Sequence, residues 1–374
     1  MVYGVPYWRF RKVDGSEFQG WIQIDKTMAI KSILILGSSV PGALENFYHH
    51  GFEKEGVSVD RFGIADRYYA FLNKSIMNRV MNKLSPDIFY QKINEDLLRF
   101  LSKKRYDVIL VFKGMELFPQ TVQQLKNHAA LIANYNADHP YIFYAPGSGN
   151  QHVVNSIAHY DVHFSYAKKI VQQLQKNFNK QAYCVPFGYD ERVYAAQSPA
   201  NNSFAGRALF IGAYDEERAT YLNKLQYSIL DIYGEPKWRS RNLLRPSVRQ
   251  AYRNRSLYNN DYVEAITAAL GIINLLRRQN LQEDSHNMRT FEVPGYGGLL
   301  ISQRTGEQTE YFQEDKEAVF FDSADELREK LTYLAAHPAV VEQIKRAAYN
   351  KSVFSGYSYH QRSKQLLSCL LNHF

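Results

Sequence analysis

Polar and charged residues crowd the segment between Asn274 and Leu300. The segment reads as a strand, a polar loop, a short helix, two glycines and a second strand, with Arg289 and Glu292 near the start of the helix. A helix N-terminus offers free amide groups and partial positive charge, so it suits a phosphate, and an adjacent arginine strengthens this preference. The Glu292 carboxylate can accept two hydrogen bonds at once, which matches the neighbouring hydroxyls of a ribose. The pattern therefore predicts a nucleotide site.

The same residues also have a simpler structural interpretation. Arg289 and Glu292 could form a local ion pair, while Gly297 and Gly298 could serve only to end the helix and let two backbones approach closely. Each residue taken alone favours this interpretation. Their clustering at the end of a strand favours the nucleotide site, because parallel α/β sheets bind ligands beyond the carboxyl ends of their strands.

Strand-like and helix-like segments alternate along the chain, which predicts an α/β protein with parallel sheets. In the first half, strands are expected at 33–36, 106–112, 130–135, 162–165 and 182–185. Helices are expected there at 43–53, 64–83, 119–127 and 167–178. The second half repeats the pattern, with strands at 207–212, 229–234, 271–275, 298–302 and 318–321 and helices at 215–226 and after Ser323.

The length of 374 residues indicates about two domains. We expect a leader or extra segment at 1–27, an N-terminal Rossmann-like domain at 28–198, and a C-terminal Rossmann-like domain at 206–355. A final helix at 356–374 is expected to pack back on the first domain. The turn-rich stretch 195–206 is the expected linker. Two facing sheets would place the site in the cleft between the domains.

Composition excludes several classes of protein. Hydrophobic residues make up 45% and charged residues 22%, which is ordinary for a globular chain and not for a disordered one. The two cysteines, Cys184 and Cys369, support neither a disulfide framework nor a cysteine zinc site. Apolar runs are too short to span a bilayer, and the N-terminus lacks the apolar region of a signal peptide. The expected location is therefore the cytoplasm.

Several catalytic motifs are missing from the sequence. It contains no Asp-x-Asp, no Walker A motif, no His-Glu-x-x-His and no Gly-x-Ser-x-Gly. Gly147 and Gly149 begin a glycine-rich turn, but His152 stands where the dinucleotide fingerprint has its third glycine. Hydride transfer, P-loop hydrolysis and serine hydrolysis therefore lack sequence support.

Further motifs extend the pattern around Glu292. The run Met288-Arg289-Thr290-Phe291-Glu292-Val293-Pro294, followed by Gly297-Gly298, Tyr311-Phe312, Phe320-Phe321-Asp322 and Glu326-Leu327, resembles the C-terminal domain of the CgeB-like (spore maturation protein) glycosyltransferases of the GT-B superfamily. Segments 210–212, 232–234 and 274–275, with Arg218, fit the same pattern. Segments 136–140, 160–161 and 186–190 are similar to family landmarks, so the resemblance covers about residues 31 to 365.

The resemblance implies a GT-B fold, in which two Rossmann-like domains face a central cleft. The C-terminal domain would hold a nucleotide sugar, with Glu292 on the ribose, and the N-terminal domain would hold most of the acceptor. Asp284, eight positions before Glu292, would replace the first acid of the Glu-x7-Glu pattern that lies near the donor sugar. The other implied donor-site residues are Gly212, Arg218, Gly234, Asn274, Arg277, Arg289, Thr290, Gly297 and Gly298.

The resemblance also implies partners and chemistry. No metal and no cofactor are expected, a UDP-sugar is the guessed co-substrate, and the acceptor would be a glycan, a lipid-linked compound or a protein. Catalysis would rest on stabilising the departing diphosphate and positioning the acceptor hydroxyl. An inverting enzyme would also need a base. Asp138 is the leading candidate for this base, with His139 and His163 behind it. Each has a simpler interpretation, as a turn-capping aspartate or an ordinary core or surface histidine.

The segment 237–255 carries seven cations and no carboxylate. It accounts for most of the net charge of +8. The first interpretation is a solvated face. The second is contact with an anionic membrane surface or a lipid-linked acceptor, which would make the protein peripheral at the inner membrane face. The third, placed last, is nucleic acid stacked on Trp238 and Tyr252. The alternative to an enzyme is thus a non-catalytic GT-B-fold protein that binds nucleic acid or an anionic surface through this segment.

Overall fold

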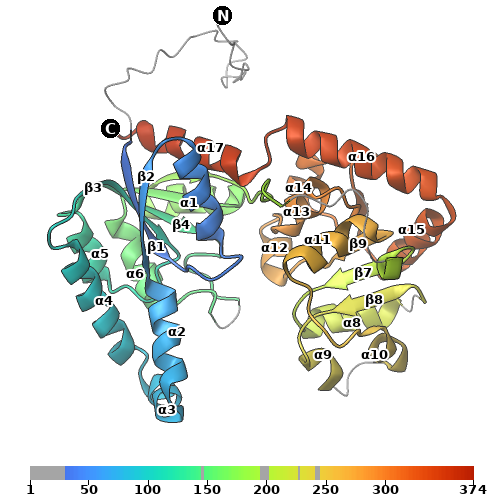
Figure 1. Ribbon diagram of the computed structural model, residues 1–374, viewed down its shortest axis with the longest axis horizontal. Coiled ribbons are helices and arrows are strands. Elements are labelled where there is room, and N and C mark those ends of the chain that lie inside the picture. The colour runs from blue at the N-terminus through green and yellow to red at the C-terminus, as the bar shows by residue number, and fades with distance from the viewer. Residues whose placement is uncertain (1–29, 145–146, 194–201, 226–227, 241–244) are drawn as a thin grey trace, which may run out of the picture.

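The computed structural model describes residues 30–144, 147–193, 202–225, 228–240 and 245–374 (Figure 1). The first half of the chain forms a six-stranded parallel sheet in the order β2-β1-β3-β4-β5-β6. Its strands are β1 (Ser32–Gly37), β2 (Ser58–Gly63), β3 (Tyr106–Phe112), β4 (Ala129–Asn136), β5 (Val162–Ser165) and β6 (Gln181–Cys184). Its helices are α1 (Leu44–Lys54), α2 (Ile64–Lys74), α3 (Ile76–Leu84), α4 (Asp87–Leu101), α5 (Pro119–Leu125), α6 (Gln151–Ser156) and α7 (Lys168–Phe178).

The second half forms a five-stranded parallel sheet in the order β11-β10-β9-β7-β8. Its strands are β7 (Ala208–Ile211), β8 (Leu230–Tyr233), β9 (Gly271–Asn274), β10 (Leu300–Gln303) and β11 (Val319–Phe321). The shorter helices around it are α8 (Glu216–Leu225), α9 (Lys237–Ser240), α10 (Pro246–Ala251), α11 (Asn259–Ala268), α12 (Arg278–Gln282), α13 (Arg289–Gly295) and α14 (Gly306–Tyr311). Three longer helices complete the chain: α15 (Ala324–Ala336), α16 (Pro338–Phe354) and α17 (Tyr359–Leu371).

The central strands are buried on both faces, as their unbroken apolar runs predict. In β1 the side chains of Ile33 to Leu36 are at most 1% exposed, and in β3 the run from Val108 to Val111 is fully buried. One apolar cluster packs beneath each face of the first sheet, and the larger of the two continues into the second half of the chain. The two sheets are therefore joined by shared core and do not form separate globules.

Several contacts lock the two halves together. The ring of Tyr166 stacks on Phe187 at 4.7 Å, and the edge of His286 meets both rings. His286 is fully buried and bonds Glu307 through Nδ1 at 2.7 Å. The other carboxylate oxygen of Glu307 accepts a hydrogen bond from the backbone amide of Lys168 at 2.7 Å. Lys168 is the first residue of α7, in the first half of the chain. These bonds hold the carboxyl ends of the two sheets near each other.

The chain crosses back to its first half at the end. The backbones of Tyr189 and Ser358 form a parallel bridge, and α17 then packs against α1 (Figure 1). The Phe47 and Tyr359 rings stack at 4.6 Å. A Cβ on Gly51 would lie 2.1 Å from the Ser363 hydroxyl, so the close approach of the two helices depends on that glycine. The predicted leader at 1–27 and most of the predicted linker lie outside the described residues, and the domain limits stay a prediction.

The structure corrects the expected elements at the edge of the first sheet. Strand β2 and helix α4 were not expected, and the helix expected at 64–83 is broken into α2 and α3. Edge strand β2 carries polar residues such as Asp60, so it lacks the apolar run of a central strand. Ser75 causes the break: its backbone is extended, with φ −159°, and its side chain accepts the Asn78 amide as the N-cap of α3.

No helix among the described residues is long and apolar enough to cross a membrane.

Candidate active site

The described residues form two adjoining cavities between the halves of the molecule. The larger holds about 710 Å³ and the smaller about 280 Å³. Ala213, Arg289 and Glu292 line both. Phe47 of α1 closes the larger cavity from the first half, and Asp138, just beyond β4, closes the smaller one. Both cavities lie beyond the carboxyl ends of the strands, where ligands of parallel sheets bind.

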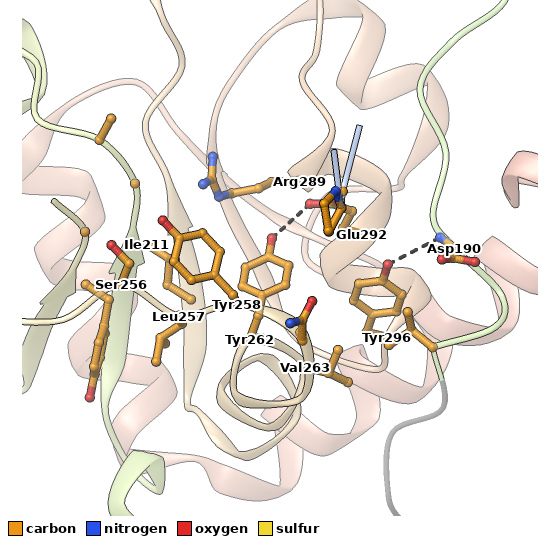
Figure 2. A pocket seen from close by; sticks show the side chains of 18 of the residues that line it. Asp190, Ile211, Ser256, Leu257, Tyr258, Tyr262, Val263, Arg289, Glu292 and Tyr296 are labelled. Atoms are coloured by element: carbon orange, nitrogen blue, oxygen red, sulfur yellow. Dashed lines mark hydrogen bonds between the residues drawn. The ribbon is translucent and has the colours of Figure 1, made fainter. Parts of the chain in front are cut away.

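Glu292 stands on the wall that the two cavities share (Figure 2). Its Oε2 accepts the hydroxyl of Tyr262 from α11 at 2.9 Å. Burial raises the pKa of the Glu292 carboxyl, while the nearby Arg289 guanidinium opposes that rise. No ion pair joins Arg289 to Glu292 in the described part of the chain, so the simpler interpretation of these two residues as a local salt bridge is wrong. The carboxylate retains acceptor capacity for a ligand.

Three guanidinium groups line the smaller cavity, those of Arg218, Arg277 and Arg289. Arg218 is buried and is held in place by two bonds to the Leu275 carbonyl, at 3.2 and 3.0 Å. Burial, together with the charges of Arg289 and Arg277, lowers the pKa of Arg218 to about 10. The Nε of Arg289 is buried without a hydrogen-bond partner among the described residues. Like charges this close favour an anionic ligand.

Three of the backbone amides near the start of α13 are already hydrogen-bonded within the chain. The amides of Thr290 and Phe291 donate to Asn287 and Met288, and the Glu292 amide also donates to Met288. These three amides are therefore not available to a phosphate, and the expected phosphate site at this helix N-terminus stays a prediction. The three arginines that line the smaller cavity are further groups that could bind a phosphate.

Gly212 and Gly234 end strands β7 and β8 and line the larger cavity. A Cβ on Gly234 would stand 2.1 Å from the Gly212 carbonyl oxygen. That oxygen also accepts the Trp238 indole N–H at 2.9 Å. Gly234 is needed because two strand ends and a buried ring meet at this corner of the cavity.

Gly234→Ala should therefore destabilise the fold. The added methyl group meets backbone atoms, which cannot move aside as a flexible side chain would, and overpacking of this kind costs about 1 to 3 kcal/mol. Urea unfolding of the purified variant should show a lower free energy of unfolding by an amount in that range. An unchanged midpoint and slope would contradict the close approach of the two strand ends.

Four other predicted site residues do not line either cavity. The side-chain amide groups of Asn274 and Asn287 form two hydrogen bonds with each other, at 3.1 and 2.8 Å. Of these two residues, only Asn287 lines the smaller cavity. The buried Thr290 hydroxyl donates to Gln308 at 2.8 Å. Gly297 has φ +83°, and a Cβ on Gly298 would lie 2.5 Å from Ile266. We infer that these residues position α13 and do not touch a ligand.

Asp284 is not brought to the cavities. It is exposed, has φ +50°, and its Oδ1 accepts the Gly306 amide at 2.7 Å at the start of α14. Its neighbour Glu283 points inward instead, and lies buried with Oε1 3.7 Å from His139 Nε2. The structure thus places Asp284 in a turn outside both cavities.

Asp138 lines the smaller cavity and forms an ion pair with Lys113 at 2.6 Å. Lys113 has φ +57° and also donates to the Gly147 carbonyl at 2.9 Å, so its ammonium group is held in place by two partners. The strand expected at 106–112 ends directly before Lys113, and no role was predicted for this residue. The structure makes Lys113 the residue that orients Asp138.

The histidine candidates are not brought to a cavity. His139 is fully buried; its Nδ1 accepts the Ile142 amide at 3.1 Å, and its Nε2 lies 3.0 Å from Gln173 Oε1. Burial lowers the pKa of His139. Burial also lowers the pKa of His163, to about 4. His163 bonds the Ile157 carbonyl at 3.0 Å. Both ring nitrogens of His139 are occupied, so it is corrected to a structural residue.

Several cavity residues had no sequence signal of their own. Tyr262 lies in a helix without a motif, although it donates to Glu292. The Tyr296 hydroxyl accepts a hydrogen bond from the Asp190 backbone amide at 3.3 Å (Figure 2). Glu235 directly follows Gly234 at the end of β8. An acidic residue after a strand and a glycine was the one sequence signal that could have identified Glu235 as a cavity residue. Its Oε1 accepts the Tyr214 amide at 3.1 Å.

The basic segment 237–255 is partly neutralised. Arg253 pairs with Asp231 at 2.5 Å and Arg255 with Asp261 at 3.2 Å. Trp238 is fully buried against Phe210, so the expectation that it stacks on a nucleic-acid base is wrong. Lys237, Arg239, Arg245 and Arg249 are exposed, and residues 241–244 lie outside the described residues.

Residues 217–368 match the family model described as glycosyl transferase-like. No curated protein sequence gives a match. Among solved structures, sucrose-phosphate synthase from Thermosynechococcus elongatus is similar, with a TM-score of 0.64 at 11% identity over 90% of this chain and 97% of that one. HepE from Anabaena, solved with UDP-glucose, has a TM-score of 0.60 at 12% identity over 92% and 100% of the two chains.

The α,α-trehalose 6-phosphate synthase from Burkholderia multivorans is similar as well, with a TM-score of 0.57 at 12% identity, covering 91% of this chain and 98% of that one. At such identities a structural likeness shows the fold alone. The family match independently covers α13, the arginine-lined wall and the following strands. The chain therefore has the predicted GT-B fold and carries a glycosyl transferase-like domain at residues 217–368, which confirms the prediction of a glycosyltransferase at the level of fold and domain family.

Proposed function

We propose that the protein moves a sugar from a nucleotide diphosphate sugar to an acceptor hydroxyl. The observation that carries this proposal is the place of Glu292, on the wall between two cavities and beside the partnerless Nε of Arg289. A ribose bound to Glu292 would leave its base in the larger cavity and its diphosphate against the arginines. The smaller cavity would then receive the sugar. The similar structure of HepE from Anabaena was solved with UDP-glucose, so a UDP-sugar is the first donor to test.

The chemistry follows from the order of these groups. The bond between the anomeric carbon and the diphosphate oxygen breaks, and the electron pair leaves with the diphosphate. Arg289, Arg277 and Arg218 would stabilise that growing negative charge, which is worth most inside a water-poor site. The acceptor oxygen bonds to the anomeric carbon, and its proton passes to a base. We propose Asp138 as that base, held by Lys113 on the first-half side of the smaller cavity.

We also propose that the enzyme is CgeB-like, on the strength of the Met288 to Pro294 run that carries Glu292. Its reaction is proposed to be independent of metal. Among the described residues, no group of three or more His, Cys, Asp or Glu side chains could hold a metal ion. The acceptor is proposed to be a glycan, a lipid-linked compound or a protein.

The proposal is tested by thermal shift with UDP, GDP, TDP and ADP and their glucose conjugates. A ligand at 100 times its dissociation constant adds about 2.7 kcal/mol of stability. One nucleotide series should raise the melting temperature, and the conjugate of that series should release free nucleotide diphosphate in the presence of an acceptor extract. No shift with any of these ligands would refute the proposal.

Asp138→Asn should separate binding from turnover. Asparagine keeps the shape and can still accept a bond from Lys113, but it cannot take a proton from the acceptor. Nucleotide affinity should stay within about twofold, while kcat should fall about 100-fold or more, the usual scale of general-base catalysis. Asp161→Asn is a matched control, because Asp161 pairs with Lys126 away from both cavities. Undiminished turnover in Asp138→Asn would remove Asp138 from the mechanism.

A further inference from the structure

Helix α3 exposes its apolar side chains to solvent. Ile76 is 80% exposed, Met77 69%, Val80 53% and Leu84 82%, and no residue of this helix is buried. Ile76, Val80 and Leu84 follow one another at intervals of four, so they form a single row along the helix. Isolated apolar residues on a surface are ordinary, but a contiguous row is a mark of an interaction site.

The polar side of α3 is turned toward the protein. The Asn78 side chain donates to the Phe71 carbonyl at 2.7 Å, and the Asn82 side chain accepts the Tyr68 hydroxyl at 2.7 Å. Both partners belong to α2. A helix that covers a soluble core has the reverse arrangement, with apolar residues inward and polar residues outward. The hydrogen bonds of Asn78 and Asn82 therefore fix α3 in the orientation that leaves its apolar row uncovered.

The segment that carries this row holds charges of one sign. Residues 67–86 include four cations and no carboxylate. Lys74, Arg79 and Lys83 are exposed, and the helical repeat places Arg79 and Lys83 beside the row of Ile76 and Val80. An apolar row flanked by cations is the pattern of a helix that lies in the surface of an anionic bilayer.

The position of α3 suits a flat partner. Helices α2 and α3 project from the first half and end at the lower extremity of the molecule in Figure 1. Helices α9 and α10 of the second half reach the same end of the molecule, where Arg239 and Arg245 are exposed. A projecting tip with cations on both halves can meet one negatively charged plane, whereas a protein partner would need a groove shaped to this single helix.

We propose that α3 is a membrane-docking helix, which inserts Ile76, Val80 and Leu84 shallowly into the surface of an anionic lipid bilayer. The nearby cations contact the lipid headgroups, and each contributes about fivefold to the binding constant. This assignment does not depend on the proposed transferase activity. It moves the expected membrane contact from the segment 237–255 to α3, with the exposed cations of that segment in a supporting role.

The test is co-sedimentation of the full chain with vesicles of phosphatidylcholine, with and without phosphatidylserine. The wild type should bind the phosphatidylserine vesicles at physiological salt and bind the neutral ones weakly. The triple variant Ile76→Ser, Val80→Ser, Leu84→Ser should lose about tenfold or more in vesicle affinity, because most of the inserted apolar area is removed. Phe354→Ser is the matched control, since Phe354 is 86% exposed on α16, and it should bind as the wild type does.

A second variant keeps the apolar row and removes charge. Arg79→Gln, Lys83→Gln should lose roughly twentyfold in affinity for phosphatidylserine vesicles and little for neutral ones. The proposal is overturned if the wild type does not bind phosphatidylserine vesicles, or if the triple variant binds them as well as the wild type does. It is also overturned if light scattering shows a dimer that the triple variant converts to a monomer, because the row would then be covered by a second copy of the chain.

Discussion

Replacing Glu292 by glutamine is expected to weaken the binding of the donor nucleotide about thirtyfold. A hydrogen bond to a charged acceptor contributes about 1.5 to 3 kcal/mol, and 2 kcal/mol corresponds to roughly thirtyfold in affinity. Glutamine has nearly the same size and can still accept the Tyr262 hydroxyl, which in the wild type lies 2.9 Å from Oε2. The loss would therefore report the missing charge and not a collapsed cavity. Isothermal titration calorimetry with the nucleotide selected by thermal shift measures it.

Without ligand, the Glu292→Gln variant should be at least as stable as the wild type. Burial raises the pKa of Glu292 in the folded state, so the folded state favours the protonated form more than the unfolded chain does. Any stability that this group contributes is present below its unfolded pKa and is lost as the pH rises through the folded one. At neutral pH the wild-type carboxylate is therefore a cost. Glu292→Gln should melt at the same temperature as the wild type or higher.

The same shift gives the pH dependence of binding. The ionised carboxylate is the form that accepts two ribose hydroxyls, so wild-type affinity should fall as the pH is lowered through the raised pKa of Glu292. The variant should lack that fall. Glu329→Gln, on the exposed face of α15, is the control and should leave affinity and pH dependence unchanged. A variant that binds the nucleotide like the wild type, or that melts much earlier, contradicts the role given to Glu292.

Arg289→Gln should produce the larger loss of turnover. Arg289 lines both cavities, and its buried Nε has no hydrogen-bond partner among the described residues. This nitrogen is therefore available to bind a diphosphate. Removing one group that stabilises developing negative charge commonly costs 100-fold to 1,000-fold in rate. We expect kcat/KM to fall by about that range, with kcat carrying most of the loss.

A control variant tests whether the loss of any arginine charge would lower turnover. Arg328→Gln removes an exposed arginine that pairs with Asp325 on α15, and it should leave kcat/KM within about twofold. Arg289 also lowers the pKa of Glu292, so Arg289→Gln should shift the pH dependence of nucleotide binding upward. Turnover within a few-fold of the wild type would contradict the placement of the diphosphate against Arg289.

The sequence predicted the parts of the site that lie in regular structure. Buried parallel strands have continuous apolar runs, and all ten expected strands were found. The Met288 to Pro294 run placed Arg289 and Glu292 on one short helix, and the structure brings both to the shared cavity wall. The arginines 218 and 277 were likewise named and lie in the smaller cavity. Local spacing was sufficient for Arg289 and Glu292, whereas Arg218 and Arg277 were expected only from the family resemblance.

The sequence failed where a single rotation decides which way a side chain points. Asp284 and Glu283 are neighbours, yet a positive φ at Asp284 turns it to solvent while Glu283 lies buried beside His139. His139 follows Asp138 directly but bonds the Ile142 amide and not the cavity. Trp238 was read as part of an exposed basic segment, whereas the turn after Gly234 buries it. None of these orientations follows from residue type or spacing.

The central claim is that Glu292 holds the ribose of a nucleotide donor, and a thermodynamic cycle tests it most directly. The affinities of the wild type and of Glu292→Gln would be measured by calorimetry for the selected nucleoside diphosphate and for its 2′-deoxy analogue. We predict that the wild type binds the 2′-deoxy analogue about tenfold more weakly than the parent nucleotide, because a bond to a charged acceptor is lost. The variant should bind the two nucleotides almost equally. If removal of the 2′-hydroxyl weakens binding by the same factor in the wild type and in the variant, Glu292 does not contact the ribose.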